Sequence, residues 1–193
     1  SFRAGRPREE GVLGHDGVAL AGDAFDGRIV RHAVAPRLGR GSTFTSLFGR
    51  ELPVPAWIYT HLEQWHHVSF LRAPRTLRVL LDLRREAREP ERLDALLHLV
   101  QEDLGFELYR AVEGVKRALS AGAKAELAFE AGPATIREAV AREAFEAWID
   151  ALLEAIAGCV DALLARAGVA PGEVDRVFLT GGSARVPAVR RLF

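Results

Sequence analysis

The stretch that decides the fold is VFLTGGSARVP at residues 177–187, in which an apolar run leads into two glycines, a hydroxyl, an arginine and a proline. The apolar run predicts a strand. Gly181 and Gly182 have no Cβ, so the backbone there can adopt positive φ and approach a ligand closely. Ser183 suits the N-cap of a helix whose first turn holds Pro187, and free N–H groups at such a start attract polar or anionic ligands. The stretch therefore predicts one wall of a nucleotide site.

The composition narrows the classes of partner. The 193-residue chain has 26 basic and 26 acidic residues and a formal net charge of zero, so no overall field attracts nucleic acid or an anionic membrane. No apolar run approaches the roughly 20 residues that span a bilayer. The single cysteine cannot form an internal disulfide, which fits a reducing compartment. We therefore expect a cytoplasmic protein with neither a nucleic-acid nor a membrane partner.

Both ends of the sequence predict that the chain is a fragment. Residues 1–11 are mostly glycine, proline, arginine and glutamate, so we expect a mobile leader there. There is no methionine, even at position 1. At the other end, the helix that follows Pro187 has a single turn before Phe193 and no room to bury an apolar face. We expect both ends to be cuts through a larger domain.

Apolar spacing predicts an α/β fold. Asp16-Gly17 suits the turn of a hairpin over residues 12–21, and a helical run at 25–36 ends at Gly39. Glycines and prolines predict a surface loop at 39–55. The remaining elements are helices at 57–68, 77–88, 93–100 and 106–120, strands at 125–129 and 135–140, a helix at 141–168 that Gly168 ends, and a strand at 177–180. We expect the hairpin, the two middle strands and 177–180 to form one mixed sheet, with a helical subdomain at 55–105.

The helix around residue 115 carries a second polar constellation. Glu113, Lys116, Arg117 and Ser120 follow one another at steps of three and four, so they share one face. The pattern alone favours a solvated face with a Glu113–Arg117 ion pair. A functional interpretation is that Arg117 stacks on a base while Glu113 accepts a hydrogen bond from a hydroxyl, with Arg185 as the opposite wall.

Several other reactive residues are better explained by structure. A turn explains Asp16 and a helix start explains Asp26, so neither is needed as a metal or acid–base group. His61, His66 and His67 resemble a metal cluster only in composition, because neighbours on a helix point in different directions, and we expect no zinc. Cys159 suits a packed thiol. The arginines between 72 and 88 alternate with leucines, which favours an amphipathic helix over a nucleic-acid site.

Four segments in order resemble the nucleotide-binding domain of DnaK-type heat-shock chaperones. They are LAGDAFDGRIV at 20–30, EGVKRALS at 113–120, REAFE at 142–146 and TGGSARVP at 180–187. The resemblance covers about residues 12–193. The block at 55–105 departs from the ordinary chaperone, and its tryptophans are more similar to those of the divergent YegD-like branch.

The resemblance implies lobe II of an actin-like ATPase, a ribonuclease H-like fold, formed by residues 12–54 and 106–193 with an inserted helical subdomain at 55–105. In that family two arginines sandwich the adenine, and Arg117 and Arg185 match their positions. The residues that match adenosine-contacting positions of the family are Gly22, Glu113, Lys116, Arg117, Ser120, Gly181, Gly182, Ser183 and Arg185.

The implied function is the adenine-nucleotide-binding half of a chaperone-like ATPase. The cofactor is ATP or ADP, with Mg²⁺ expected only in the complete parent domain, because no glycine-rich phosphate loop occurs in this sequence. We expect no catalytic residue here and no hydrolysis by the fragment alone. An exchange factor or co-chaperone is a candidate partner of the helical subdomain.

Two alternatives stay open at this point. One is a protein-interaction module with a remnant nucleotide face, which exposure of Trp57 and Trp65 on one patch would favour. The other is a fragment of an actin-like metabolite kinase, against which the Lys-Arg-Ala-Leu-Ser segment at 116–120 argues.

Overall fold

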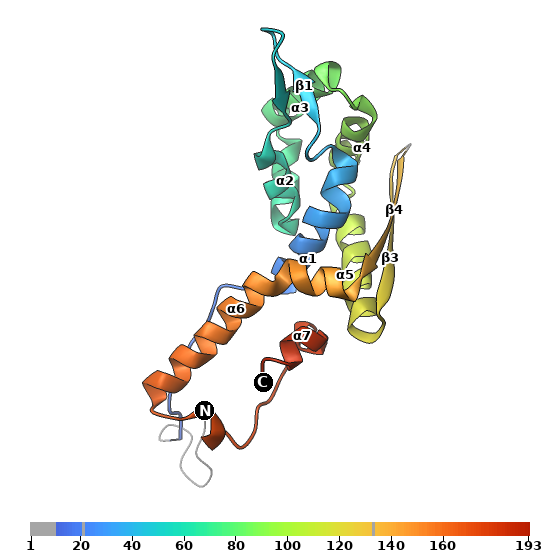
Figure 1. Cartoon of the computed structure of the whole chain (residues 1–193). Helices are drawn as coiled ribbons and strands as arrows, with labels where there is room; N and C mark the ends of the chain where they lie inside the picture. Colours follow the sequence, from blue (N-terminus) through green and yellow to red (C-terminus); the bar gives the residue numbers. More distant parts are fainter. Residues whose placement is uncertain (1–10, 21, 133) are drawn as a thin grey trace. The chain divides into compact units, whose positions relative to one another are not determined.

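The computed structural model describes residues 11–20, 22–132 and 134–193, which form two compact units. One unit is Gly22–Trp148, and the other combines residues 11–20 with Ile149–Phe193 (Figure 1). The predicted leader at 1–11 lies outside the described residues, apart from Gly11.

The first unit opens with three consecutive helical segments. They are α1 (Gly22–Ile29), the π-helical turn η1 (Val30–Val34) and the 3₁₀ helix η2 (Ala35–Leu38). The segment ends at Gly39, whose φ of 94° favours glycine. The predicted helical run and its end at Gly39 are therefore confirmed.

The predicted loop at 39–55 is wrong in part, because it contains a small antiparallel hairpin. Strands β1 (Thr43–Thr45) and β2 (Glu51–Pro53) pair with each other. Residues 46–50 connect them, and Gly49 in this turn has a φ of 70°. β-branched threonines favour an extended strand. The glycines and prolines that predicted a loop mark only the turn and the ends of the hairpin.

Four helical segments follow. They are α2 (Ala56–Leu62), the 3₁₀ helix η3 (Trp65–Arg72), α3 (Pro74–Glu86) and α4 (Pro90–Gln101). The single helix predicted at 57–68 is thus wrong, because Gln64 is extended and separates α2 from η3. The amphipathic α3 is confirmed, since Leu80 and Leu83 are buried. Arg84 donates to both carboxylate oxygens of Asp94, at 2.7 and 2.9 Å, and ties α3 to α4.

Helix α5 (Gly105–Ala121) lies against a two-stranded antiparallel sheet of β3 (Lys124–Ala131) and β4 (Ala134–Ala141) (Figure 1). The helix and both strands are confirmed. Apolar residues of the two elements form a buried core, because helical spacing and strand alternation direct them to one side. They are Leu108, Val112, Val115 and Leu119 of α5, and Leu127, Phe129, Ile136 and Val140 of the sheet.

Helix α6 (Arg142–Ala167) is confirmed, and Gly168 follows it at a φ of 62°. The rest of the chain holds three short segments, η4 (Pro171–Glu173), η5 (Ser183–Arg185) and α7 (Pro187–Arg190). Among the described residues, no helix is long and apolar enough to cross a membrane.

The prediction of a single mixed sheet is wrong. The described residues form two separate two-stranded sheets, and residues 177–180 have no regular secondary structure. Phe178 there is 84% exposed. A strand needs a neighbouring backbone to satisfy its N–H and C=O groups, and no residue in the described ranges pairs with this segment.

The hairpin predicted at 12–21 is also wrong, because residues 13–20 contain no strand. The Asp16 carboxylate instead contacts the next backbone N–H and an arginine distant in sequence. Its Oδ1 accepts a hydrogen bond from the Gly17 N–H at 2.8 Å, and its Oδ2 pairs with Arg166 of α6. The predicted turn chemistry of Asp16-Gly17 is thus present, but it is not flanked by paired strands.

Candidate functional site

A buried ion pair joins α1 to α5. The Lys116 ammonium donates to Asp26 Oδ2 at 2.7 Å and to the Gly22 carbonyl oxygen at 3.2 Å. The side chains of Lys116 and Asp26 are only 13% and 11% exposed. This contact brings Gly22 together with Lys116 of α5.

Asp26 lies in an unfavourable environment for a carboxylate. Its Oδ1 is buried and has no hydrogen-bond partner among the residues that the structure describes. Burial raises the pKa of Asp26, the hydrogen bond and charge of Lys116 oppose that shift, and the carboxylates of Glu113 and Asp23 add to it. The assignment of Asp26 to a helix start is wrong, because this residue faces α5 one turn after the α1 N-terminus and is the ionic partner of Lys116.

The sequence pattern did not predict this pair, because two residues 90 positions apart carry no joint periodicity. One signal was available. Asp26 lies between Phe25 and Ile29, which mark the buried side of α1, and an acid at such a place needs a cationic partner.

The other polar side chains of α5 remain near solvent. Glu113 Oε1 accepts from the Arg117 guanidinium at 3.2 Å, and these side chains are 57% and 70% exposed. The predicted Glu113–Arg117 pair is therefore present. The Ser120 hydroxyl donates to the Lys116 carbonyl oxygen at 3.0 Å, a common contact for serine inside a helix.

The terminal candidate segment is a turn followed by short helices. Gly181 has a φ of 86°, whereas Gly182 has an ordinary helical φ of −64° and occupies the N-cap of η5. The prediction that Ser183 is an N-cap is wrong, because Ser183 is already the first residue of η5 and makes no capping hydrogen bond. Pro187 does begin α7, as predicted.

Hydrogen bonds to backbone carbonyl oxygens within the segment stabilise its conformation. The Arg185 N–H donates to the Gly182 carbonyl oxygen at 3.1 Å, and Arg190 Nε donates to the Ala184 carbonyl oxygen at 3.0 Å. The Arg185 side chain is exposed, while Val186 and Val189 are buried. That Arg117 and Arg185 form opposite walls of one site stays a prediction.

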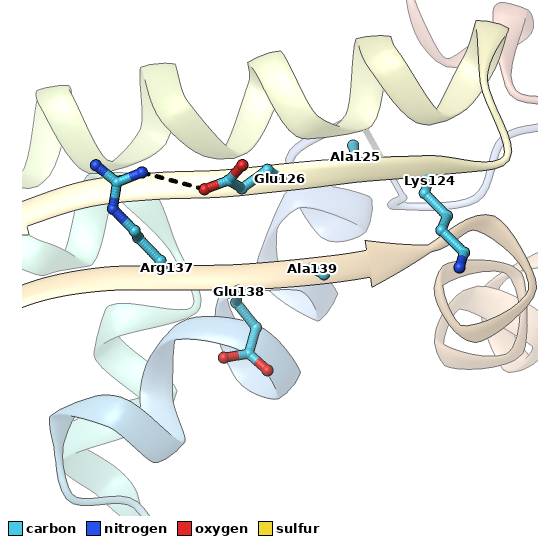
Figure 2. Close-up of a pocket in the computed structure, with 6 residues that line it drawn as sticks. All are labelled: Lys124, Ala125, Glu126, Arg137, Glu138 and Ala139. Carbon is cyan, nitrogen blue, oxygen red and sulfur yellow. Dashed lines mark hydrogen bonds and ion pairs between the residues drawn. The ribbon is translucent and has the colours of Figure 1, made fainter.

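An open pocket on the hairpin of β3 and β4 lies elsewhere, and it includes none of the predicted site residues (Figure 2). Three of its charged lining side chains have ionic partners: Arg137 pairs with Glu126 at 3.3 Å, and Glu138 accepts from Arg37 at 2.7 and 3.0 Å. These ion pairs compensate the charges of Arg137, Glu126 and Glu138. The residues that line it are Lys124, Ala125, Glu126, Arg137, Glu138 and Ala139.

Aromatic and histidine side chains gather on α2 and η3. The expectation that His66 and His67 point in different directions is wrong, because their ring centroids are 4.4 Å apart and the His61 ring is 5.6 Å from that of His67. Across the described ranges, no three histidine, cysteine or carboxylate side chains are arranged to hold a metal ion. We call the aromatic and histidine side chains of α2 and η3 the ring cluster: Trp57, His61, Trp65, His66, His67 and Phe70.

Comparison with known proteins adds an independent line of evidence. The family model described as Hsp70 protein matches residues 86–193. The chaperone protein DnaK of Thermus thermophilus, from each of two strains, is 38% identical to this chain over 60 residues. That alignment covers 31% of this chain and 10% of each relative. Because the family model spans more than half of the sequence, the chain belongs to the Hsp70 family.

Proposed function

We propose that this chain is the adenine-nucleotide-binding half, lobe II, of a chaperone-like ATPase. The Hsp70 family implies an actin-like ATPase fold, and the mixed helices and small sheets are consistent with it. In this proposal residues 12–54 and 106–193 belong to the lobe, and residues 55–105 are its helical subdomain. Hsp70 membership argues against the metabolite-kinase alternative.

The observation that carries the proposal is the contact of Lys116 with Gly22 and Asp26. It joins the start of α1 to the face of α5 that also bears Glu113 and Arg117. A preformed group of donors and acceptors loses less entropy on binding than a mobile one. The exposed Arg117 guanidinium is free to stack on a base, and the Glu113 carboxylate to accept from a hydroxyl.

The terminal segment supplies the remaining contacts in this proposal. Gly181 and Gly182 have no atom within 4 Å of an added Cβ, so their backbone is open to a ligand. Arg185 is assigned to the second face of the adenine and Ser183 to polar contacts with the nucleoside. The cofactor is ATP or ADP, whose phosphates and Mg²⁺ we assign to residues of the parent domain outside this chain.

Calorimetric titration of the 193-residue chain with ADP tests the proposal. We expect weak, saturable binding, and we expect either Arg117→Ala or Arg185→Ala to abolish it. Arg110→Ala is the matched control, because Arg110 is an exposed arginine of the same helix α5 that lies over the Phe106 ring. If the two site variants bind ADP as tightly as the control does, the site assignment is wrong.

A second candidate function is protein binding at the ring cluster. Trp57, Trp65 and Phe70 are 42%, 60% and 57% exposed, and exposed aromatic side chains commonly anchor interfaces. The neighbouring turns of α3 present Arg75 and Arg78, which are both exposed. These charges favour an acidic segment of a partner protein, such as an exchange factor or co-chaperone.

Tryptophan fluorescence of a Trp148→Phe variant tests this candidate, because only the two ring-cluster tryptophans then report. A synthetic peptide that alternates glutamate with leucine should change the emission saturably, and Arg75→Ala with Arg78→Ala should weaken the response. An equal response to an uncharged serine–leucine peptide would contradict an acidic partner.

A further inference from the structure

Lys116 uses only part of its hydrogen-bonding capacity. An ammonium group has three N–H donors. Two of them reach Asp26 Oδ2 and the Gly22 carbonyl oxygen, and no third acceptor is recorded among the residues that the structure describes. The side chain is 13% exposed, so a small part of it reaches the surface of the α1–α5 contact. One N–H is therefore available to a ligand.

Asp26 fixes the direction of that donor. The 2.7 Å contact with Asp26 Oδ2 and the 3.2 Å contact with the Gly22 oxygen hold the nitrogen from two sides, both within α1. Asp26 depends on the same contact, because no donor within the described ranges reaches its buried Oδ1. A flexible lysine stem thus becomes a fixed group, which it would not be on an open helix face.

Asp26 also compensates the positive charge of the Lys116 ammonium. One carboxylate beside one ammonium leaves no net charge on the pair itself, and the carboxylates of Glu113 and Asp23 also act on Asp26. A compensated cation attracts a phosphate weakly, whereas its free N–H still donates to a neutral oxygen. The residue type fits this role. Lys116 and Lys124 are the only lysines among 26 basic residues, and an ammonium is a compact point charge, whereas a guanidinium is a planar fork.

We propose that Asp26 is a positioning residue that aims the free N–H of Lys116 at a neutral oxygen of the nucleoside and cancels the charge that would otherwise favour phosphate. This proposal rests on the proposed nucleotide-binding function. It makes Asp26 a determinant of selectivity for the nucleoside part over the phosphates, although Asp26 itself does not touch the ligand.

The test compares adenosine and ADP as ligands of the whole chain by calorimetry. In Asp26→Asn, we expect the affinity for adenosine to fall about tenfold and the preference for ADP over adenosine to rise at least fivefold, since the ammonium then loses its paired carboxylate. Asp23→Asn removes the same charge from the same helix and should change both affinities less than twofold. Lys116→Arg keeps the charge and should still lose adenosine binding.

The outcomes separate the possible failures. If Asp26→Asn weakens both ligands by the same factor while its circular dichroism stays native, the residue is merely structural and the positioning role is wrong, although the nucleotide site stands. The same conclusion follows if Asp23→Asn has the same effect as Asp26→Asn. If the wild-type chain binds neither adenosine nor ADP, the proposed function is wrong and the positioning role falls with it.

Discussion

The two segments that carry the candidate site differ in what holds them. Between α1 and α5, Lys116 and Asp26 are paired and nearly buried, and Val115 and Leu119 anchor the helix beneath them. In the terminal segment, Gly181 adopts a positive φ in an exposed turn, and Phe178 just before it is 84% exposed. Packing fixes the first segment and local backbone preference fixes the second. A substitution at the α1–α5 contact should therefore lower the free energy of unfolding. A substitution in the terminal segment should mainly change the local backbone conformation.

The largest effect is expected for Lys116→Met, which leaves the Asp26 carboxylate buried without its cation. Breaking a buried pair in this way typically costs about 3–5 kcal/mol of unfolding free energy. Urea unfolding monitored by circular dichroism measures the loss. Lys124→Met is the control, because Lys124 is exposed on β3 and should change stability by less than about 0.5 kcal/mol.

The pH dependence sharpens this result. Burial already holds the pKa of Asp26 above its usual value, so the folded chain binds this proton more tightly than the unfolded chain. The contribution of Asp26 protonation to stability is fully present below the unfolded-state pKa and is lost as pH rises through the folded-state pKa. The deficit of Lys116→Met should thus shrink as pH falls, and a deficit that is equal at all pH values would point to lost packing alone.

A second large effect is expected for Gly27→Ala, within the packed part of α1. An added Cβ would lie 2.5 Å from the Glu63 carbonyl oxygen, a backbone atom that cannot move aside cheaply. Overpacking of this kind costs about 1–3 kcal/mol. Gly114→Ala in α5 is the matched control, because no atom lies within 4 Å and alanine should stabilise the helix by up to about 1 kcal/mol. Equal thermal stability of the two variants would overturn the predicted close approach.

A smaller effect is expected in the terminal segment for Gly181→Ala, because its φ of 86° disfavours a residue with a Cβ by about 1 kcal/mol. Gly182→Ala should be close to neutral, since Gly182 has a φ of −64° and open space around it. Amide chemical shifts of residues 180–186 report the turn. If the amide chemical shifts change by the same amount in both variants, the turn does not depend on the conformation of Gly181.

The smallest effect is expected for Glu113→Ala, on the exposed side of α5. The pair with Arg117 is solvated, so its loss should cost about 0.3–0.5 kcal/mol and less at high salt. Urea unfolding at low and high salt checks this. A loss above about 1 kcal/mol would mean that the pair is not the solvated contact described for α5.

The sequence predicted what depends on local periodicity and missed what depends on distant partners. Helix α5 was foreseen because Leu108, Val112, Val115 and Leu119 recur at helical spacing. The strand at 177–180 was wrong because strand formation needs a neighbour that an apolar run does not reveal. The Lys116–Asp26 pair was missed for the same reason, since tertiary packing alone brings α1 to α5. The candidate residues themselves came from the resemblance, not from periodicity.

The central proposal is that Gly22, the α5 face and residues 181–185 contribute to one nucleoside site. The most direct measurement is an adenosine titration of the ¹⁵N-labelled chain followed by two-dimensional amide spectra. We predict that the amides of Gly22, Arg117, Gly181 and Arg185 shift with one common dissociation constant while those of the ring cluster stay in place. Shifts confined to one of the two segments, or found only at the ring cluster, would contradict the claim.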